Sequence, residues 1–543
     1  MKFLRTFETS PSPFSFRRAR VSALLSSAAF ILNACSGCSS SSTQTATSSE
    51  LCSVSQESFQ AALDSTADVS YLAENLTSCS GGNYPAFPGA QGYGACATGG
   101  RGGQVIEVTN LNPSGAGSLQ NAINTAGPRI VVFRVSGIID ATLEITHGDL
   151  TIAGQTSPGG ITVRGILCDN EVYESSYTCE NVIIRHIRTR PATTSVRDTT
   201  SAIIDDGLRL DGAQNFMGDH LSIENGFDET MQVSRSSNIT LQNSILAELI
   251  DEEHTWGTGM LINYSSVDHP LQNLSFHHNT WNRQQSRLPE ISCEENEDDG
   301  TSNCTGRTLN LELSNNLIFD QGMGIWYDAA GTGGSSTGFN LNLNWIGNMA
   351  FNRSDYDLPI MNQDIGTTSG NQIFFSDNRY FQFPDLMNYA LMGCCNGYPG
   401  DGAYSGTPST AISARHAFPT LSYSDSEQLL AYSVRYMGAF PRDPMDRRLM
   451  NPVAQQTIAT AGDFASRMKN PCGDAFSTDD ASESAITDSD HDGMPDTWES
   501  QNGLNPSSQD STGTTLGNAQ GYTGLTNIEV YLHERHQTII GVD

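Results

Sequence analysis

One short phrase recurs along the middle of the chain and constrains the fold more than any other feature. It is an Asn, then four residues, then His or Asn, and its five copies start 34, 23, 35 and 37 residues apart. The copies are Asn181–His186, Asn215–His220, Asn238–Asn243, Asn273–His278 and Asn310–Asn315. A unit near 23 residues, with insertions of about 12, fits a coil of three short strands joined by variable loops. Such coils stack, bury their apolar residues inward and can align Asn side chains in ladders.

The segments around these phrases are short, β-rich runs separated by clusters of Gly, Asn, Asp and Ser. Examples are Ile130–Val135, Leu150–Ile152, Ile161–Val163 and Val182–Ile184, none long enough for a helical core pattern. With 51 Gly and only 16% charged residues, the composition suits a turn-rich β protein. We therefore expect an all-β fold, a right-handed parallel β-helix over residues 84–470. A β-sandwich with long loops is the alternative.

The formal net charge of −32 excludes one class of partner. A polyanion such as nucleic acid needs a basic surface, and no basic stripe exists here. The acidity is concentrated, because residues 471–543 carry 13 acids and a single Arg. This pattern points toward cations as ligands.

The N-terminal 35 residues read as an export signal. Arg17, Arg18 and Arg20 precede an apolar stretch, Val21–Leu32, that is too short to span a bilayer. Cys35 follows a small residue, as in a bacterial lipoprotein box, which predicts lipidation at Cys35 and a secreted or outer-surface lipoprotein of a bacterium. Ordinary signal-peptidase cleavage is the alternative. Residues 36–83 are expected to form a Ser/Thr-rich tether and N-terminal segment, and no transmembrane segment is expected.

Twelve cysteines in an exported protein predict disulfides. The short-range candidates are Cys52 with Cys79, Cys168 with Cys179, and Cys293 with Cys304. Vicinal Cys394 and Cys395 are candidates to pair with Cys472 or Cys96. The spacing alone leaves this connectivity open.

Several motifs resemble the opening of pectate lyases of polysaccharide lyase family 1. They are Phe87–Gly94, Thr98–Gly103, Val108–Asn112 and Gly117–Leu119. The similarity continues through Asp206–Val233, His277–Pro289 and Pro441–Arg448. The resemblance implies a parallel β-helix with a surface cleft for polygalacturonate, its substrate partner. It also implies calcium-dependent β-elimination that yields unsaturated oligogalacturonates, and we expect a monomer.

This elimination removes the proton α to a uronate carboxylate, and a hard cation bound to that carboxylate disperses the developing charge. The resemblance places the first calcium ligand at Asp206, which lies 13 residues before Asp219. Asp228 falls at the second position. At the third position this sequence has Gln232, and Glu229 is the acid that can compensate.

The catalytic residue implied by the resemblance is Arg287, in an Arg-x-Pro motif. Arg is normally always protonated, so two roles stay open: a base at alkaline pH, or a cation that polarises the dianion while hydroxide or water takes the proton. No Lys occurs between residues 3 and 468 to bind substrate. Arg283 and His254 are therefore the substrate-binding candidates, with Arg188 and Arg190 as alternative cations.

A second calcium motif lies near the C-terminus. Oxygen ligands stand at loop positions 1, 3, 5, 9 and 12, with Gly493 at position 6 for the sharp turn. These ligands are Asp488, Asp490, Asp492, Asp496 and Glu499. The loop resembles thrombospondin type 3 and EF-hand-like repeats. We expect residues 471–543 to form a small acidic calcium-binding tail, in which the ion orders residues 488–540.

Two other functions fit parts of the pattern. A galacturonan hydrolase on the same scaffold would use grouped acids for acid–base chemistry. A non-catalytic β-helical protein would bind carbohydrate or act in adhesion, with calcium in a structural role. The product separates them, because elimination leaves a conjugated double bond and hydrolysis does not.

Overall fold

The computed structural model describes most of the residues that follow position 51, and they belong to one compact unit, Gln44–Asp543. The described residues are 52, 54–71, 79, 84–169, 178–191, 206–249, 259–293, 304, 306–322, 324–327, 339–353, 359–394, 402–458, 470–479 and 486–542. The predictions of a signal peptide, of lipidation at Cys35 and of a role for His254 lie outside these residues.

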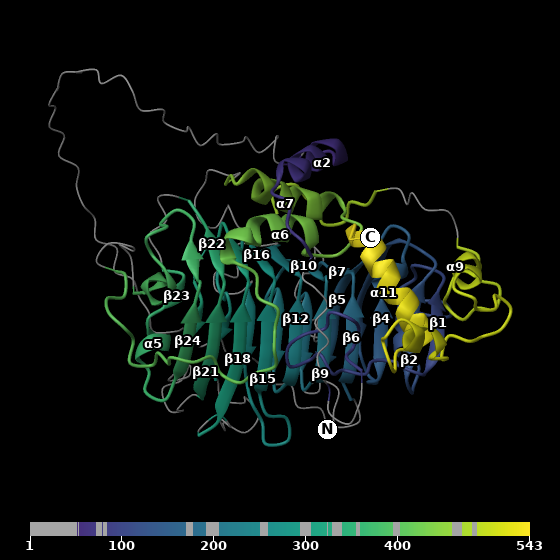
Figure 1. Ribbon diagram of the computed structural model, residues 1–543, viewed down its shortest axis with the longest axis horizontal. Helices are drawn as coiled ribbons and strands as arrows, with labels where there is room; N and C mark the ends of the chain where they lie inside the picture. Colours follow the sequence, from purple (N-terminus) through teal and green to yellow (C-terminus); the bar gives the residue numbers. More distant parts are fainter. Residues whose placement is uncertain are drawn as a thin grey trace, which may run out of the picture. The chain divides into compact units, whose positions relative to one another are not determined.

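Parallel strands form one face of the fold as a ten-stranded sheet (Figure 1). In order these are β1 (Gln104–Val108), β2 (Arg129–Phe133), β4 (Leu150–Ala153), β6 (Glu180–Arg185), β9 (Gln214–Asp219), β12 (Ser237–Gln242), β15 (Gln272–His277), β18 (Thr308–Ser314), β21 (Asn340–Ile346) and β24 (Gln372–Ser376). Each strand pairs with the strand one coil away, so sequence neighbours lie in different faces.

A fourteen-stranded sheet supplies the other two faces, because the long strand β5 (Ile161–Asp169) pairs with β7 along its first half and with β8 along its second. We call β7 (Ile187–Thr189), β10 (Ser222–Gly226), β13 (Ile245–Leu249), β16 (Thr280–Asn282), β19 (Leu317–Phe319), β22 (Met349–Phe351) and β25 (Arg379–Tyr380) the first ribbon. The second ribbon is β8 (Leu208–Asp211), β11 (Met231–Ser234), β14 (Met260–Asn263), β17 (Glu290–Ile291) and β20 (Trp326–Tyr327). Strand β3 (Gly137–Glu144) pairs with β5, and β23 (Met361–Asn362) pairs with β26 (Met392–Gly393) in a separate two-stranded sheet. The predicted right-handed parallel β-helix is confirmed.

The recurring Asn phrase marks the turns at both ends of the strands of the ten-stranded sheet. Asn181, Asn215, Asn238 and Asn273 adopt positive φ, as do His186 and His220 at the other end of the phrase. Asn and His tolerate this left-handed region better than most residues. The side-chain amides form the predicted ladder: Asn215 donates to Asn181 at 3.3 Å, and the bonds continue one coil at a time to Asn342.

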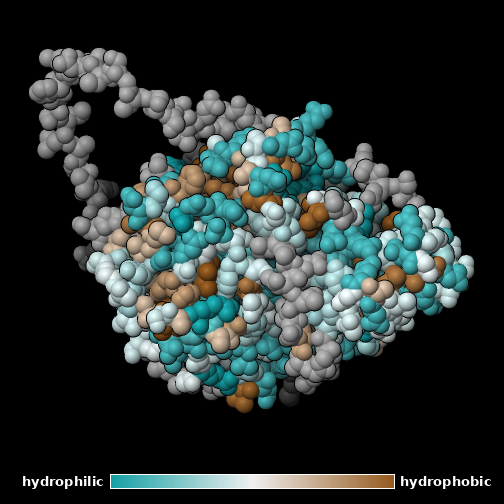
Figure 2. Space-filling view, viewed as in Figure 1, coloured by the Kyte–Doolittle hydropathy of each residue, from teal (hydrophilic) through white to brown (hydrophobic). Residues whose placement is uncertain are grey.

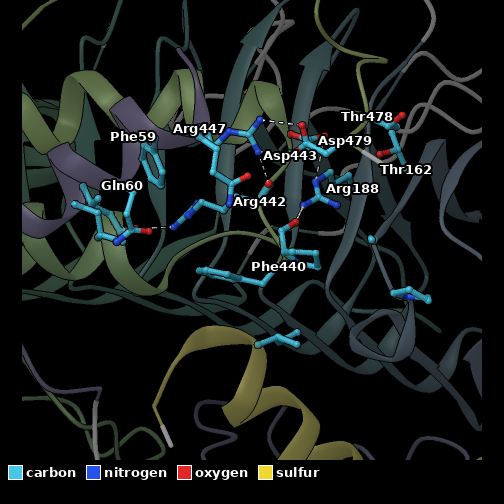
Figure 3. A pocket seen from close by; sticks show the side chains of 18 of the residues that line it. Phe59, Gln60, Thr162, Arg188, Phe440, Arg442, Asp443, Arg447, Thr478 and Asp479 are labelled. Atoms are coloured by element: carbon cyan, nitrogen blue, oxygen red, sulfur yellow. Dashed lines mark hydrogen bonds and ion pairs between the residues drawn. The ribbon is translucent and has the colours of Figure 1, made fainter. Parts of the chain in front are cut away.

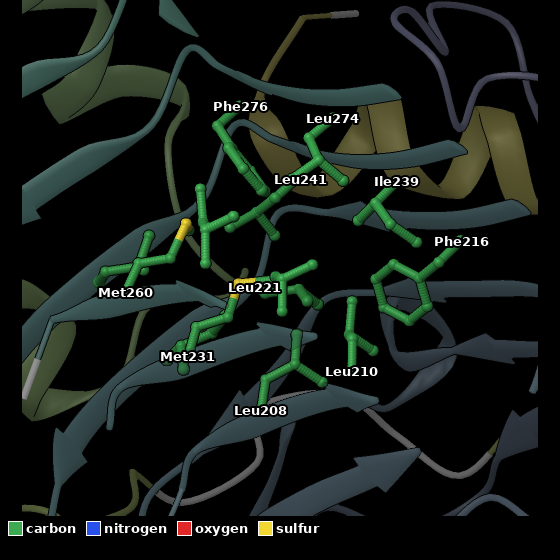
Figure 4. Packing of buried hydrophobic residues seen from close by; sticks show 14 of the residues in the cluster. Leu208, Leu210, Phe216, Leu221, Met231, Ile239, Leu241, Met260, Leu274 and Phe276 are labelled. Carbon is green, nitrogen blue, oxygen red and sulfur yellow. The ribbon is translucent and has the colours of Figure 1, made fainter. Parts of the chain in front are cut away.

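The interior is filled by one residue set from all three faces (Figure 4). Leu208 and Leu210 of β8, Phe216 of β9 and Leu241 of β12 are fully buried there. Alternating positions on each strand point inward, so stacked coils make a continuous apolar column. The packing of this column sets the distance between successive coils, and therefore the spacing between residues on successive turns.

Helices cover parts of the outer surface. They are α2 (Gln56–Ser65), α3 (Leu119–Ile123), α5 (Asp364–Thr367), α6 (Leu429–Tyr436), α7 (Pro444–Gln455), α9 (Asp496–Gln501), α10 (Thr515–Ala519) and α11 (Asn527–Ile540), with single 3-10 turns η2 (Gly154–Thr156), η3 (Asn388–Leu391) and η4 (Ser426–Gln428). Helices α2, α6 and α7 pack on outward apolar residues of the first ribbon, such as Ile245 and Phe319. Helix α11, which opens with a capping box at Thr526 and Glu529, lies over the early strands of the ten-stranded sheet (Figure 1).

Four disulfides join described cysteines. Cys168–Cys179 and Cys293–Cys304 confirm two of the predicted pairs. The predicted Cys52–Cys79 pair is wrong, since Cys52 bonds Cys472 and Cys79 bonds Cys96. The reason is that the N-terminal segment packs against α6 and α7, far along the sequence. Because Cys96 and Cys472 are thus engaged, the suggested bonds of Cys394 to them are also wrong; Cys394 is itself disulfide-bonded.

The surface in Figure 2 is mainly hydrophilic, with small scattered apolar areas. Within the described ranges, the helices are all too short or too polar to cross a bilayer.

Candidate functional site

Five residues predicted from sequence lie where the chain passes from the first ribbon to the second, four of them on the turns and one on β11. They are Asp206, Asp228, Glu229, Gln232 and Arg287, which we call the Arg287 site. Backbone hydrogen bonds link these turns. The amide of Gly207 donates to the carbonyl of Glu229 at 3.1 Å, and the amide of Met260 donates to the carbonyl of Arg287 at 2.6 Å. The coil repeat therefore brings residues of three coils together.

A glycine allows the closest of these approaches. A Cβ atom at Gly259 would lie 1.9 Å from the carbonyl oxygen of Arg287 and 2.1 Å from that of Ser286. No side chain fits at that distance, so the turn that carries Arg287 can lie against the coil before it only because residue 259 is Gly. Arg287 itself has a φ of 57°.

Arg287 lies between two carboxylates. Its Nη1 contacts Oε1 of Glu229, and its Nε donates to Oε2 of Glu290 at 2.9 Å. The Glu229 amide in turn donates to Oδ1 of Asp206 at 3.0 Å. Asp206, Glu229 and Arg287 thus form one series of contacts that spans four coils, from the turn before β8 to the turn before β17, which the sequence numbering alone does not show.

The remaining members of the site are less closely joined. The side-chain amide of Gln232 donates to Oγ of Ser234 at 2.8 Å, and Asp228 is half-buried on its turn. Asp206 also accepts from Arg209 at 3.4 Å. Among the described residues, the acid and histidine groups close enough to share one ion do not include these cleft candidates. However, Oε2 of Glu229 is buried and has no hydrogen-bond partner within the described part of the protein.

The substrate-binding candidates with positive charge are engaged elsewhere. Arg283 is buried, and its Nε lies 3.0 Å from Oε1 of Glu248, which also binds Arg448. Arg188 pairs with Asp446 at 2.8 Å. Arg190 pairs with Asp443 and Glu224, each at 2.5 Å. These guanidinium groups join helix α7 to the first ribbon, so their geometry gives no support to a role in substrate binding.

Arg188 also lines a pocket of about 420 Å³ beside α2, α6 and α7 (Figure 3). Its other charged walls include Arg442, Asp443, Arg447 and Asp479, with Arg447 and Asp479 paired. Burial lowers the pKa of Arg442 to about 10. Four Arg and two Asp line this pocket, and it has no lining residue in common with the Arg287 site, so we do not assign the reaction to it.

Sequence reasoning missed a group of three buried histidines, His186, His220 and His536. The amide of Phe440 donates to Nδ1 of His186 at 3.1 Å, so the ring proton sits on Nε2, which faces Nδ1 of His536 at 2.9 Å. A neutral ring with both nitrogens engaged has no lone pair for a metal. The signal was present for two of them, since His186 and His220 end copies of the recurring phrase.

The C-terminal acids predicted as calcium ligands also come together in part. Two groups close enough to hold an ion are Asp488, Asp490 and Asp492, and Asp492, Glu499 and Asp510. Asp496 is in neither group, because its carboxylate accepts from the amide and the hydroxyl of Ser489, both at 2.7 Å. Asp510 was not predicted, since it lies outside the twelve-residue loop.

The sequence is similar to several curated proteins that share one description. No family model matches the sequence. Curated relatives carry the description "Probable pectate lyase C": one from Aspergillus flavus is 32% identical over 445 residues, covering 81% of this chain and 92% of the relative. One from Neosartorya fischeri is 32% identical over 450 residues with the same coverage, and one from Emericella nidulans is 31% identical over 464 residues, covering 81% and 91%.

Solved structures share only a distant likeness. A Bacillus pectate lyase in complex with trigalacturonate is 13% identical with a TM-score of 0.39, covering 64% of this chain and 98% of that one. A pectate lyase bound to a hexasaccharide is 12% identical with a TM-score of 0.38, covering 68% and 98%. Family membership rests on the fungal relatives alone.

The same relatives correct the predicted source. They are fungal, which points away from the bacterial lipoprotein predicted from the Cys35 pattern. That prediction rested on a single Cys after a small residue, with Asn33 an unusual occupant of the motif. A pattern of so few residues arises readily by chance in a Ser- and Ala-rich segment.

Proposed function

The chain belongs to the pectate lyase family, as a polysaccharide lyase, and from this premise we propose that it cleaves α-1,4-polygalacturonate by calcium-dependent β-elimination at the Arg287 site. The observation that carries this proposal is the series of contacts from Arg287 through Glu229 to Asp206. It places a cation beside carboxylates on the turns that match the family's catalytic motifs.

The donor chemistry of the site fits calcium. Asp206, Asp228, Glu229 and Gln232 offer oxygen atoms only, which a hard cation prefers. The buried Oε2 of Glu229, without a partner in the described part of the protein, supports this fit. When bound, calcium would supply positive charge that stabilises the dianion formed from the uronate.

Arg287 is the proposed catalytic residue. In β-elimination the proton α to the uronate carboxylate leaves, the electron pair forms a carbon–carbon double bond, and the glycosidic oxygen β to the carboxylate departs. The contacts with Glu229 and Glu290 are charge-assisted pairs between the guanidinium and carboxylates. This arrangement favours the version in which Arg287 stabilises charge on the uronate while hydroxide or water takes the proton.

The test is the product formed from polygalacturonate. Purified protein with calcium should generate ultraviolet absorbance from the conjugated double bond, and a chelator should abolish it until calcium is restored. Reducing ends without this absorbance would indicate the hydrolase, and neither signal would indicate the binding-only protein. Either result would overturn the proposal.

A matched pair of variants assigns the reaction to the site. Arg287→Ala should lose the absorbance signal, whereas Arg379→Ala should retain it. Arg379 is also an Arg paired with two acids, Asp377 and Glu427, but it stands on β25 of the first ribbon. Equal loss in both variants would show that the effect is not specific to the Arg287 site.

A further inference from the structure

Part of the acidic tail packs against one end of the β-helix. Met494, Ile528 and Leu532 pack against Ile130 and Val132 of β2. Arg134, just after β2, contacts Asp488 and donates to Glu107 of β1 at 2.6 Å. Strand β1 is the edge strand of the ten-stranded sheet, so the tail packs against the first strands of this sheet.

The loop from Asp488 to Gly493 is folded tightly around its own acids. Oδ2 of Asp488 accepts from the amide of Gly493 at 2.9 Å. Oδ1 of Asp492 accepts from Met494 at 3.2 Å, and its Oδ2 accepts from Ser511 at 2.9 Å. Gly493 has a φ of 98°, and a Cβ there would lie 2.7 Å from side-chain atoms of Ile528 and Val105.

Several carboxylate oxygens in this cluster have no hydrogen-bond partner in the described part of the chain. Both oxygens of Glu499 and of Asp490, and Oδ1 of Asp510, are buried without a hydrogen bond among the described residues. Glu499 is completely buried, and its carboxylate oxygen lies within 4.8 Å of those of Asp492 and Asp510. Buried, unpaired acids facing one another are strongly unfavourable unless a cation lies between them. Burial and the neighbouring acids raise the pKa of Glu499 to about 8 and that of Asp492 to about 6.

We propose that Asp488, Asp490, Asp492, Glu499 and Asp510 bind a calcium ion that fastens the C-terminal helices onto the first coil of the β-helix. Five carboxylates and no nitrogen or sulfur donor select a hard cation with high coordination number, which favours Ca²⁺ over Mg²⁺ and over transition metals. The ligand set differs from the EF-hand spacing, because Asp510 enters from a separate loop and Asp496 stays bound to Ser489.

The ion joins three segments that are separate in sequence. The 488–493 loop is tied to Arg134, Glu499 belongs to α9, and Asp510 precedes α10. The amide of Asn527, the first residue of α11, donates to the carbonyl of Gly513 at 2.6 Å. Calcium at this point therefore holds α11 in place. The ion stabilises the fold and takes no part in the reaction, because Arg287 lies several coils away between β16 and β17.

Calcium titration of the intact protein by calorimetry, after treatment with chelator, tests the ligand set. Glu499→Gln and Asp510→Asn should each weaken one class of calcium sites about tenfold or more, because the number of charged ligands sets the affinity. Asp496→Asn, the matched control within the same loop, should leave that class within about twofold. Unchanged affinity in Asp510→Asn, or an equal loss in Asp496→Asn, would overturn the assignment.

Thermal unfolding gives a second readout, in which the difference in stability between the parent and Glu499→Gln should change when calcium is added. In chelator, Glu499→Gln should be as stable as the parent or more stable, because it removes a repelling charge. In excess calcium the parent should gain more in Tm than the variant, since only the parent binds the ion tightly. Equal destabilisation of Glu499→Gln in both conditions would mean that Glu499 serves packing alone, and the proposal would fail.

Activity separates this inference from the proposed function. Asp510→Asn at saturating calcium should retain lyase activity, whereas Asp206→Asn should lose activity and retain the calcium-dependent gain in Tm. If the protein proves not to be a lyase, the tail site still stands or falls on calorimetry and unfolding. If Asp206→Asn also removes the gain in Tm, the tail is not where the stabilising ion binds.

Discussion

The guanidinium of Arg287, on the turn before β17, contacts the carboxylate of Glu229, on the turn before β11, across the intervening coil that carries β14. Glu229 is buried, and its other oxygen has no partner among the described residues. One acid thus faces both the proposed catalytic residue and the proposed calcium position. The charge on Glu229 links the two parts of the reaction, so altering it should affect both.

Substitution at Glu229 should change the dependence of activity on calcium. Glu229→Gln keeps the size of the side chain but removes the charge that faces Arg287. We expect a higher calcium concentration for half-maximal activity and a kcat at saturating calcium lowered on the order of 10²-fold, as for loss of one electrostatic contributor. Ultraviolet product assays over a calcium series measure both. A Glu229→Gln enzyme with the parent's calcium response and kcat would show that the contact has no part in the reaction.

Replacement of Gly259 should displace Arg287 without touching any charged group. In Gly259→Ala the new Cβ overlaps the Arg287 carbonyl, so the turn must move, and we expect a large loss of kcat together with some loss of stability. Ser292→Ala is the control in the turn after β17. Its hydroxyl is buried without a hydrogen bond among described residues, so removing it should cost little. Wild-type activity in Gly259→Ala would show that the close approach of these turns is not needed.

The fold was predictable from sequence because its determinants are local. The same Asn phrase encodes both the positive φ of each turn and the amide ladder, as at Asn215 and Asn238. The site was predictable only through resemblance. Nothing in the sequence around Arg283 signals that Glu248 on β13 and Arg448 on α7 bind it, because such contacts depend on how distant segments pack. The same limit explains the missed Asp510.

A buried second ladder of amides should contribute more stability than the half-buried one. Asn316 accepts from the side chain of Asn279 at 3.3 Å and donates to Asn348 at 3.2 Å. Asn316→Ala leaves these buried groups unpaired and should lower the free energy of unfolding by about 3 kcal/mol, whereas Asn342→Ala in the half-buried ladder should cost about 1 kcal/mol. Denaturant unfolding measures the difference. Equal costs would mean that water replaces the lost bonds in both ladders.

The buried histidines predict how stability depends on pH. Burial lowers the pKa of His186, His220 and His536 below the usual value of about 6.5, so each takes up a proton less readily in the folded state than in the unfolded state. In the unfolded state they take up protons below about pH 6.5. Since the unfolded state then binds more protons, stability is complete above that pH and falls as the pH drops toward the folded pKa, by up to about 1.4 kcal/mol per pH unit for each histidine.

Charged groups around this cluster act in both directions, because Asp219 raises the pKa of the histidines and the arginines lower it, but burial has the largest effect. Asp219 lies 2.9 Å from Nδ1 of His220 and is paired with Arg185, and these two groups hold the pKa of Asp219 well below its usual value. Asp219 therefore stays ionised while the histidines respond, and its own contribution is lost only at lower pH. Arg185 and Arg442 both disfavour a protonated His220.

His220→Asn tests how much one histidine of the cluster contributes to this dependence of stability on pH. Asn occupies the matching position of the phrase at Asn243 and Asn315, both with positive φ, so the turn should accept it. Denaturant unfolding from about pH 8 to about pH 4.5 should show a slope reduced by about one proton below about pH 6.5. His416→Asn, at a half-buried histidine outside this cluster, is the control for replacing a histidine by Asn. An unchanged slope in His220→Asn would mean that His220 takes up its proton equally in the folded and unfolded states, and the cluster would not control the acid response.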